Sequence, residues 1–201
     1  YPTHINEEVA YTIGKSYGTY IKKFNQNKCI VGHDNRYSYP ELTKALVTGI
    51  LDTGIDVVYL DLVTTPMYYY AQIKLNIPAG VMITASHNPK DDNGFKFAFD
   101  ESGNCKGQEI QDFLAYILKG EFATGEGKVT EYNITPDYLE LFRTNFNFGS
   151  RRVKAVIDPG NGTSGVIARK IYEMFPIDLE FINEESDGTF PNHHPDPCVE
   201  D

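Results

Sequence analysis

Apolar positions recur with helical spacing at the start of the chain. The intervals are four, four, four and three residues, and the positions are Val9, Ile13, Tyr17, Ile21 and Phe24. Such spacing places the five side chains on one face of a helix. Asn6 is followed by two glutamates and is a suitable N-cap with an acidic first turn. We therefore expect an amphipathic helix to begin there.

Three short apolar runs come next, at 28–34, 57–62 and 79–85. Each has the length of a strand, and the third is almost continuously apolar, as in a parallel sheet that helices cover on both faces. Stretches with helical patterns separate the runs. The order predicts a βαβαβ unit.

The helices between these runs carry recognisable start and stop residues. Ser38 and Glu41 have the spacing of a capping box, and Pro40 stands in the first turn. Gly54 is a suitable stop for this helix, and Thr65, which a proline follows, opens the next one.

The pattern changes after the third apolar run. Residues 95–99 alternate with a period of two, which predicts an added strand with one face in the core. Turn residues at 101–107 precede a helical pattern near 109–118.

A Gly-rich polar interval at 120–128 then separates two parts of the sequence. We divide the chain there into domains 1–131 and 132–201. The second domain is expected to contain a helix from Thr135, a strand at 153–158, a Gly-rich loop, a helix near 166–174 and a strand at 179–183. This set is small for an independent core.

The composition restricts the function classes. The 201 residues include 18 Lys and Arg against 28 Asp and Glu, a net charge of −10, which argues against nucleic acid as a partner. Cys29, Cys105 and Cys198 are widely spaced, which favours free thiols in a reducing compartment. No signal-peptide pattern opens the sequence, and no apolar run approaches the ~18 residues of a membrane span. We expect a cytoplasmic protein with no membrane partner.

The densest cluster of reactive side chains follows the third apolar run. It contains Ser86, His87 and, on the next predicted strand, Lys96. Ligands bind at such strand ends in open α/β sheets. A serine in a sharp turn is presented outward, a histidine exchanges protons near neutral pH, and a lysine suits an anionic group. The simpler alternative is a polar loop in which Ser86 and Asn88 make turn hydrogen bonds.

A serine hydrolase is a weaker interpretation of the same cluster. The chain has no Gly-x-Ser-x-Gly elbow. A histidine next to the serine is also poorly placed to point its ring at the hydroxyl with a carboxylate behind it.

The ten residues 80–89, GVMITASHNP, resemble the phosphoserine signature of the α-D-phosphohexomutases, the phosphoglucomutase and phosphomannomutase family. The similarity extends over nearly the whole chain. Further stretches that resemble this family are VGHDNR at 31–36, PEL at 40–42, TTP at 64–66, DPGNG at 158–162 and PNHHPDP at 191–197.

The resemblance implies an α/β fold with a three-layer αβα first domain and part of a similar second domain, from an enzyme of four domains. The parent would be an isomerase of carbohydrate metabolism that interconverts hexose 1-phosphate and hexose 6-phosphate through a phosphoserine and a bisphosphorylated sugar. The family's Asp-Gly-Asp-x-Asp-Arg magnesium loop and its sugar- and phosphate-binding loops have no counterpart in this sequence. The chain alone is therefore expected to be inactive, with the remaining domains of the parent chain as partners.

Residue by residue, the resemblance makes Ser86 the phosphoryl donor and acceptor, with its phosphate as one ligand of Mg²⁺. Lys96 matches the family's active-site lysine, and His87 matches a residue that moves protons between the sugar hydroxyl and the serine oxygen. A phosphoserine carries about −1.5 to −2 charges, so its transfer needs a cation nearby. Arg36 is a candidate substrate-binding residue, and the alternative is that it pairs with Asp34 and braces their loop.

Histidines at two other places have simpler interpretations. His33 stands where family members often have Arg or Gly, and we assign it no role. His193 and His194 are adjacent, so their side chains diverge in extended chain, and we expect a surface connector there rather than a metal pair.

The glycines at 160, 162 and 165 have the spacing of a dinucleotide fingerprint, and Glu184 follows near the end of the next predicted strand. This motif is the basis of an alternative function, a noncatalytic sugar-phosphate or nucleotide-binding module. Pro159 directly precedes the first glycine and reduces backbone freedom at the turn, so cofactor binding is the weaker interpretation.

Overall fold

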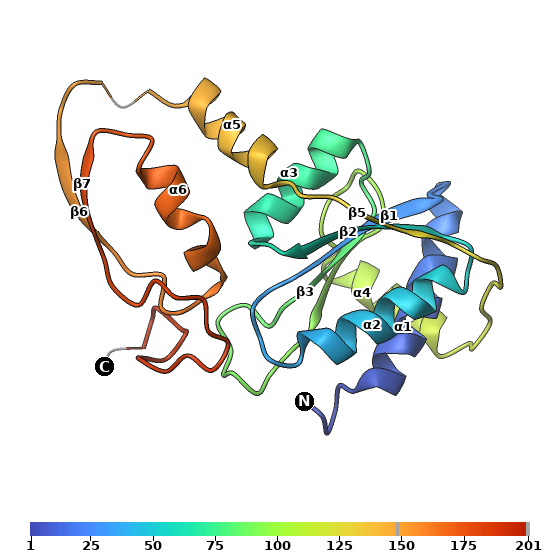
Figure 1. The fold of residues 1–201 in the computed structure, drawn as a ribbon. Helices are drawn as coiled ribbons and strands as arrows, with labels where there is room; N and C mark the ends of the chain where they lie inside the picture. The colour runs from blue at the N-terminus through green and yellow to red at the C-terminus, as the bar shows by residue number, and fades with distance from the viewer. Residues whose placement is uncertain (148, 200–201) are drawn as a thin grey trace.

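The computed structural model describes residues 1–147 and 149–199. A five-stranded sheet with its helices forms the first unit, and a two-stranded sheet with two helices forms the second unit (Figure 1). In chain order, the first unit contains α1 (Glu7–Ile21), η1 (Lys22–Phe24), β1 (Lys28–His33), α2 (Tyr39–Leu51), β2 (Asp56–Leu62), α3 (Thr65–Leu75), β3 (Gly80–Ile83), β4 (Phe95–Ala98), α4 (Gln108–Ile117) and β5 (Val129–Glu131). The second unit contains α5 (Thr135–Asn145), β6 (Val153–Ile157), η2 (Thr163–Val166), α6 (Ala168–Tyr172) and β7 (Ile177–Phe181).

The strand order of the larger sheet is β4-β3-β1-β2-β5. β1 pairs in parallel with β2 and β3, whereas β4 runs antiparallel to β3. The predicted βαβαβ order and the added strand are therefore confirmed. β5, which pairs in parallel with β2, was not predicted, because all three of its residues are exposed and leave no apolar signal.

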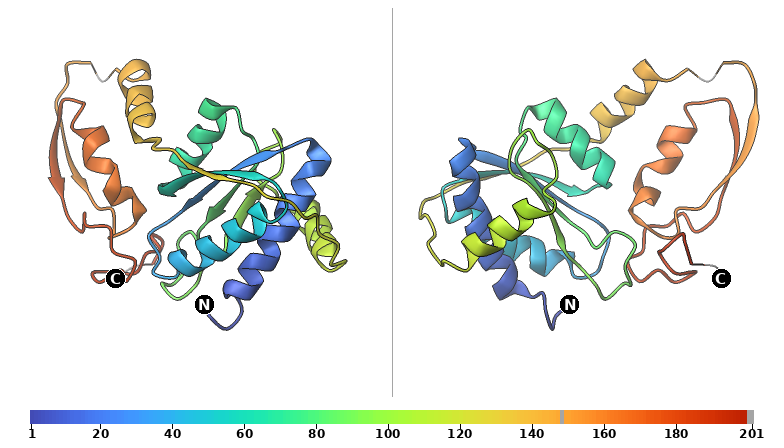
Figure 2. Two further views of the ribbon diagram at one scale, coloured as in Figure 1. Left: turned by 45° about the vertical axis from the view of Figure 1, so that its right-hand side comes forward. Right: turned by 180° about the vertical axis from the view of Figure 1, so that it is seen from behind.

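Side chains alternate between two cores on the two faces of this sheet. In β1, Cys29 and Val31 pack with residues of α1, α2 and α4, whereas Ile30 packs with residues of α3 and α5. The three layers are visible when the ribbon is turned (Figure 2). The predicted three-layer αβα arrangement follows from this alternation, because a strand that is buried on both faces needs helices on both sides.

The helices α1 and α2 cross at short range. A Cβ atom on Gly14 would lie 2.2 Å from the Leu46 carbonyl oxygen, and one on Gly49 would lie 2.3 Å from that of Tyr11. Only glycine allows the two backbones to approach so closely.

The predicted N-cap is also confirmed, because the Asn6 side chain accepts a hydrogen bond from the Val9 N–H at 3.0 Å.

The predicted capping box at Ser38 is wrong. Ser38 precedes α2, but its side chain makes no cap hydrogen bond. Its hydroxyl oxygen instead accepts from the Asn93 side-chain amide at 2.8 Å, and both residues are buried. A long-range partner thus replaces the local one.

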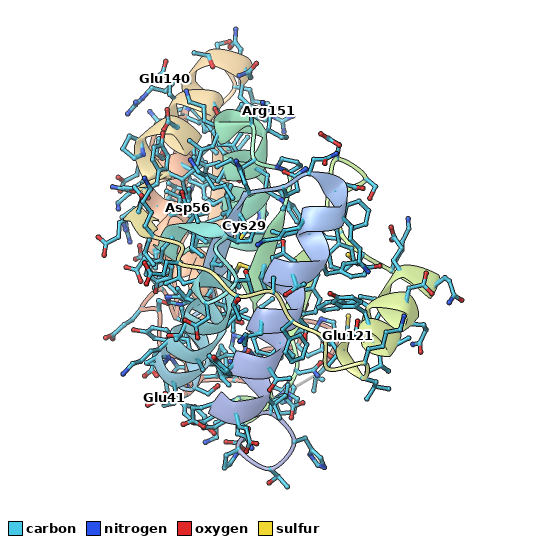
Figure 3. All side chains as sticks on the ribbon, turned by 90° about the vertical axis from the view of Figure 1, so that its right-hand side faces the viewer. Cys29, Glu41, Asp56, Glu121, Glu140 and Arg151 are labelled. Atoms are coloured by element: carbon cyan, nitrogen blue, oxygen red, sulfur yellow. The ribbon has the colours of Figure 1, made fainter. Side chains whose placement is uncertain are left out.

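Glu41, Glu121 and Glu140 lie on the outside of the molecule (Figure 3). Cys29 lies inside, and burial raises the pKa of its thiol. The three cysteines are free thiols, as predicted. Among the described helices, none is both long and apolar enough to cross a membrane.

The second unit is attached through α5, whose Tyr138 is buried in the same core as Met67 of α3 and Ile167 before α6. The helix predicted near 166–174 is divided into η2 and the five-residue α6. β7 begins at Ile177, two residues before the predicted strand. The outer face of the β6–β7 pair is open to solvent, with Val156 61% exposed.

Candidate active site

A cavity of about 490 Å³ lies at the carboxyl ends of β1, β2 and β3, between the two units. Ligands bind at this edge in open α/β sheets because the strand order reverses there. The first unit lines the cavity with side chains that include Asn35, Thr64, Thr84, Ser86 and His87, and the second unit with Asp158, Gly160, Thr163, Ser164, Phe190 and His193.

Ser86 lies in the serine loop, residues 84–94, which joins β3 to β4. The residue is exposed and has φ 57°, in the left-handed region that a serine seldom adopts. Its N–H donates to Thr84 Oγ1 at 2.9 Å, and its carbonyl oxygen accepts from Arg36 Nη2 at 3.1 Å. Backbone strain of this kind persists where the surroundings hold the residue, commonly at functional sites.

Arg36 is fully buried beneath the serine loop. Arginine has five N–H donors in a planar fork, and here each has an acceptor. Nε donates to Asp34 Oδ2 at 3.2 Å. The four remaining donors bind the carbonyl oxygens of Ser86 (3.1 Å), Asn88 (2.7 Å), Pro89 (2.5 Å) and Asp92 (3.0 Å).

This geometry corrects the assignment of Arg36 as a substrate-binding residue. All five donors are occupied within the protein, so none remains for a substrate. Asp34 Oδ1 also accepts a hydrogen bond from the Arg36 backbone N–H at 3.1 Å. Asp34 therefore binds both the backbone and the side chain of Arg36. The structure contains the bracing contact with Asp34, and Arg36 also binds four carbonyl oxygens of the serine loop.

His87 is also exposed, and its Nδ1 lies 3.4 Å from Ser86 Oγ. The ring is therefore close to the neighbouring hydroxyl, but within the described part of the chain no hydrogen bond places a carboxylate behind it. The arrangement still differs from a catalytic triad, in which Nε2 faces the serine and Nδ1 faces a carboxylate.

Lys96 lies on the edge strand β4, directly opposite Met82 of β3. Paired residues of neighbouring strands share a face, so Lys96 projects on the face of Met82, which lines the cavity. Phe95 and Phe97 pack in the core on the other face. The expected hairpin is present, but Lys96 itself is not among the cavity-lining residues that the structure describes.

The second unit supplies polar groups that we did not predict as site residues. Burial raises the pKa of Asp158, but hydrogen bonds from the Gly160 N–H, Asn183 and His193 lower it by more. His193 Nε2 lies 3.1 Å from Asp158 Oδ2, and its Nδ1 lies 2.8 Å from the His194 carbonyl oxygen. Both partners of the ring are oxygen atoms that can accept hydrogen bonds. The two histidines take different partners, since His194 Nδ1 accepts from the Asp196 N–H.

The glycine motif of the second unit does not have the geometry of a dinucleotide site. The four-residue η2 follows the loop, where the fingerprint requires the start of an α-helix. Glu184, which would bind the ribose, instead accepts from Arg169 Nε at 2.7 Å and Nη2 at 2.5 Å. These bonds lower the pKa of Glu184 and occupy both carboxylate oxygens.

His33 is buried beside the cavity rather than in it. Its ring stacks on Tyr39 with centroids 3.9 Å apart, and its Nε2 lies 3.0 Å from the Tyr59 hydroxyl and 3.2 Å from Asp61 Oδ1. These contacts explain the residue as a satisfied core histidine.

Within residues 1–147 and 149–199, no group of three His, Cys, Asp or Glu side chains is placed to hold a metal ion. Mg²⁺ prefers octahedral oxygen coordination, and Ser86 can contribute only one such ligand.

The Arg36 network generates a direct test of the serine loop. Arg36→Lys leaves three donors for five acceptors, so we expect the free energy of unfolding to fall by about 2 to 5 kcal/mol. Arg143→Lys is the matched control, because Arg143 is exposed and 3.4 Å from Glu140, and it should change stability by less than about 0.5 kcal/mol. Urea unfolding measures both variants, and an equal loss in the two would contradict the bracing role.

Comparisons with known proteins agree with the geometry. Residues 1–124 match the family described as "Phosphoglucomutase/phosphomannomutase, alpha/beta/alpha domain I". The phosphomannomutase/phosphoglucomutase of Pseudomonas aeruginosa is 38% identical over 193 residues, which are 96% of this chain and 41% of that protein. The phosphoglucomutase of Neisseria meningitidis serogroup B is 38% identical over 195 residues, which are 96% of this chain and 42% of that protein.

The fold is shared with solved structures. A phosphoglucomutase/phosphomannomutase family protein from Burkholderia thailandensis superposes with a TM-score of 0.91 and 32% identity, over 98% of this chain and 44% of that chain. The chain thus spans less than half the length of these relatives. Since the family match covers more than half of its residues, the chain belongs to the phosphoglucomutase/phosphomannomutase family.

Proposed function

We propose that this chain carries the phosphoserine of a phosphohexomutase, an enzyme that interconverts hexose 1-phosphate and hexose 6-phosphate. Ser86 supports this role, because it is an exposed serine in a left-handed turn and lines a cavity of about 490 Å³. Arg36 and Thr84 bind its main chain, so its hydroxyl takes no part in these bonds. Membership in a family whose relatives are named phosphoglucomutase and phosphomannomutase supports the substrate class.

The reaction needs only the sugar phosphate and Ser86 in its phosphorylated form. The bond between phosphorus and Ser86 Oγ breaks as a sugar hydroxyl oxygen bonds to the phosphorus, and the hydroxyl proton passes to Ser86 Oγ. The bisphosphorylated sugar turns round, and the other phosphate returns to Ser86 by the reverse steps. His87, with Nδ1 3.4 Å from Ser86 Oγ, is suited to carry the proton, since contacts of this kind are often long before substrate binds.

Positive charge beside the phosphoryl group is the second requirement. Phosphoryl transfer depends on positioning and on neutralising charge at the phosphoryl oxygens. Lys96 is suited to this task, because it projects on the sheet face of Met82 and Met82 lines the cavity. A lysine has a flexible four-carbon stem, which allows its ammonium group to move toward the cavity.

Mg²⁺ supplies further charge neutralisation in our proposal, with the Ser86 phosphate as one ligand. The other ligands, and the groups that recognise the sugar, would come from further domains of a longer protein. Val156, on the open face of β6 and β7, is 61% exposed. This exposure supports a second domain in which further residues of a longer protein cover that face. Parallel strands are ordinarily covered on both faces.

Ser86 is expected to carry a stable phosphate in the full-length protein after incubation with a hexose bisphosphate. Intact mass and peptide mapping measure this modification. Ser164 is the internal control, because it is exposed and lines the same cavity. Phosphate on Ser164 with Ser86 unmodified, in an enzyme that turns over, would reject the assignment.

Lys96→Met in the full-length protein should keep the fold and slow the reaction. Loss of one charge-assisted contact in the transition state costs about 2 to 4 kcal/mol, which is roughly a 30-fold to 1000-fold fall in kcat/KM. Lys106→Met is the control, since Lys106 is exposed in the turn before α4. If both variants retain the kcat/KM of the unaltered enzyme, Lys96 has no part in catalysis.

The 201-residue chain alone, assayed with Mg²⁺ and a hexose 1-phosphate, is expected to show no turnover. The reason is that its described residues form no metal-binding cluster. A coupled assay with the full-length protein as positive control measures this. Turnover above about 1 s⁻¹, the lower end for ordinary enzymes, would show that the chain contains a complete site.

A further inference from the structure

Three consecutive residues at the carboxyl end of β1 reach both sides of the cavity. Asp34 binds Arg36, and Arg36 binds the serine loop, as described above. Asn35, which lies between them, turns the other way and binds the second unit. One tripeptide therefore contacts both walls of the cavity.

Asn35 uses its backbone N–H and its whole side-chain amide in this contact. The backbone N–H donates to Thr163 Oγ1 at 3.1 Å, and Nδ2 donates to the Asn161 carbonyl at 2.8 Å and to Ser186 Oγ at 3.0 Å. Asn35 Oδ1 accepts from the Thr163 hydroxyl at 3.2 Å. Four hydrogen bonds thus join one residue of the first unit to three residues of the second.

The acceptors in the second unit are themselves held in place. Asn161 has a left-handed φ of 55° and is 4% exposed. Its Nδ2 donates to the Glu185 carbonyl at 2.9 Å, and its Oδ1 accepts from Asn192 at 2.8 Å. Gly188 also lies directly on Asn35, since a Cβ there would be 2.0 Å from the Asn35 carbonyl oxygen. The contact is therefore between two ordered surfaces.

A second attachment joins α5 to α3 through apolar packing and through the ion pair of Lys74 Nζ with Asp137 Oδ1 at 2.9 Å. Tyr138 of α5 packs in one core with α3 and with Ile167 before α6. Apolar burial is not directional, and a partly exposed ion pair is a weak constraint, so this attachment alone permits rotation of one unit against the other. Hydrogen bonds constrain distance and angle, and those of Asn35 lie at the cavity itself.

We propose that Asn35 is a positioning residue that sets the orientation of the second unit relative to the serine loop, and so the shape of the cavity that Ser86 faces. Its importance for catalysis rests on the proposed function, whereas its control of orientation does not. The residue acts through Thr163 and Asn161 on one side and through its neighbour Arg36 on the other.

Residual dipolar couplings of the backbone amides test this proposal in the 201-residue chain. For the unaltered chain, one alignment tensor should fit both units. Asn35→Asp keeps the size of the side chain but turns an oxygen toward the Asn161 carbonyl, so we expect the second unit to need a separate tensor while the first unit still fits its own. Asn27→Asp, the same change at an exposed residue before β1, should leave one common tensor.

Thr163→Val breaks two of the four bonds from the opposite side and should give the same separation of tensors. If Asn35→Asp fails to fold, this variant carries the test. The Asn35 amide should also exchange with solvent about fivefold faster or more in Thr163→Val, because it loses its acceptor. A common tensor in both the Asn35 and Thr163 variants, or two tensors in the unaltered chain, would overturn the proposal. These couplings need no substrate, so failure here is distinct from an absence of phosphate on Ser86.

Discussion

The buried guanidinium of Arg36 is the constraint on which the candidate site depends. A buried charge is costly unless it is paired and fully hydrogen-bonded. Here the Asp34 carboxylate offsets the charge, and four carbonyl oxygens of the serine loop take the remaining donors. The loop residues from 86 to 92 are exposed to solvent, so hydrogen bonds rather than apolar packing hold the loop. Ser86 keeps its left-handed conformation because its carbonyl belongs to this network.

The topology explains why the residues after β1 can bind both the serine loop and the second unit. β1 is the central strand of the sheet, with β3 on one side and β2 on the other. Its carboxyl end therefore lies between the serine loop, which follows β3, and the second unit, which contacts Asn35. A short polar segment at this position can reach both. The chemistry expected of Ser86 and the shape of the cavity are thus linked through adjacent residues of one loop.

Much of the first unit could be predicted, because its strands are apolar runs and its helices have periodic apolar faces. The signature around Ser86 likewise identified the family. Local patterns failed where long-range contacts decide. The Ser38 hydroxyl oxygen accepts a hydrogen bond from Asn93 instead of capping its own helix. All three residues of β5 are exposed. Asn35 binds partners 126 to 151 positions away in the sequence. The Asp34–Arg36 spacing suggested a brace, but the four carbonyl acceptors could not be read from residue types, because any residue provides a carbonyl.

Nuclear magnetic resonance of the Arg36 side chain tests whether its guanidinium holds the main chain of the serine loop. The measured quantities are the exchange of the guanidinium protons with water and the scalar couplings across the hydrogen bonds. Slowly exchanging Arg36 protons, coupled to the carbonyl carbons of Ser86, Asn88, Pro89 and Asp92, are the predicted result. Rapid exchange like that of the exposed Arg143, with no coupling to these carbonyls, would contradict the account.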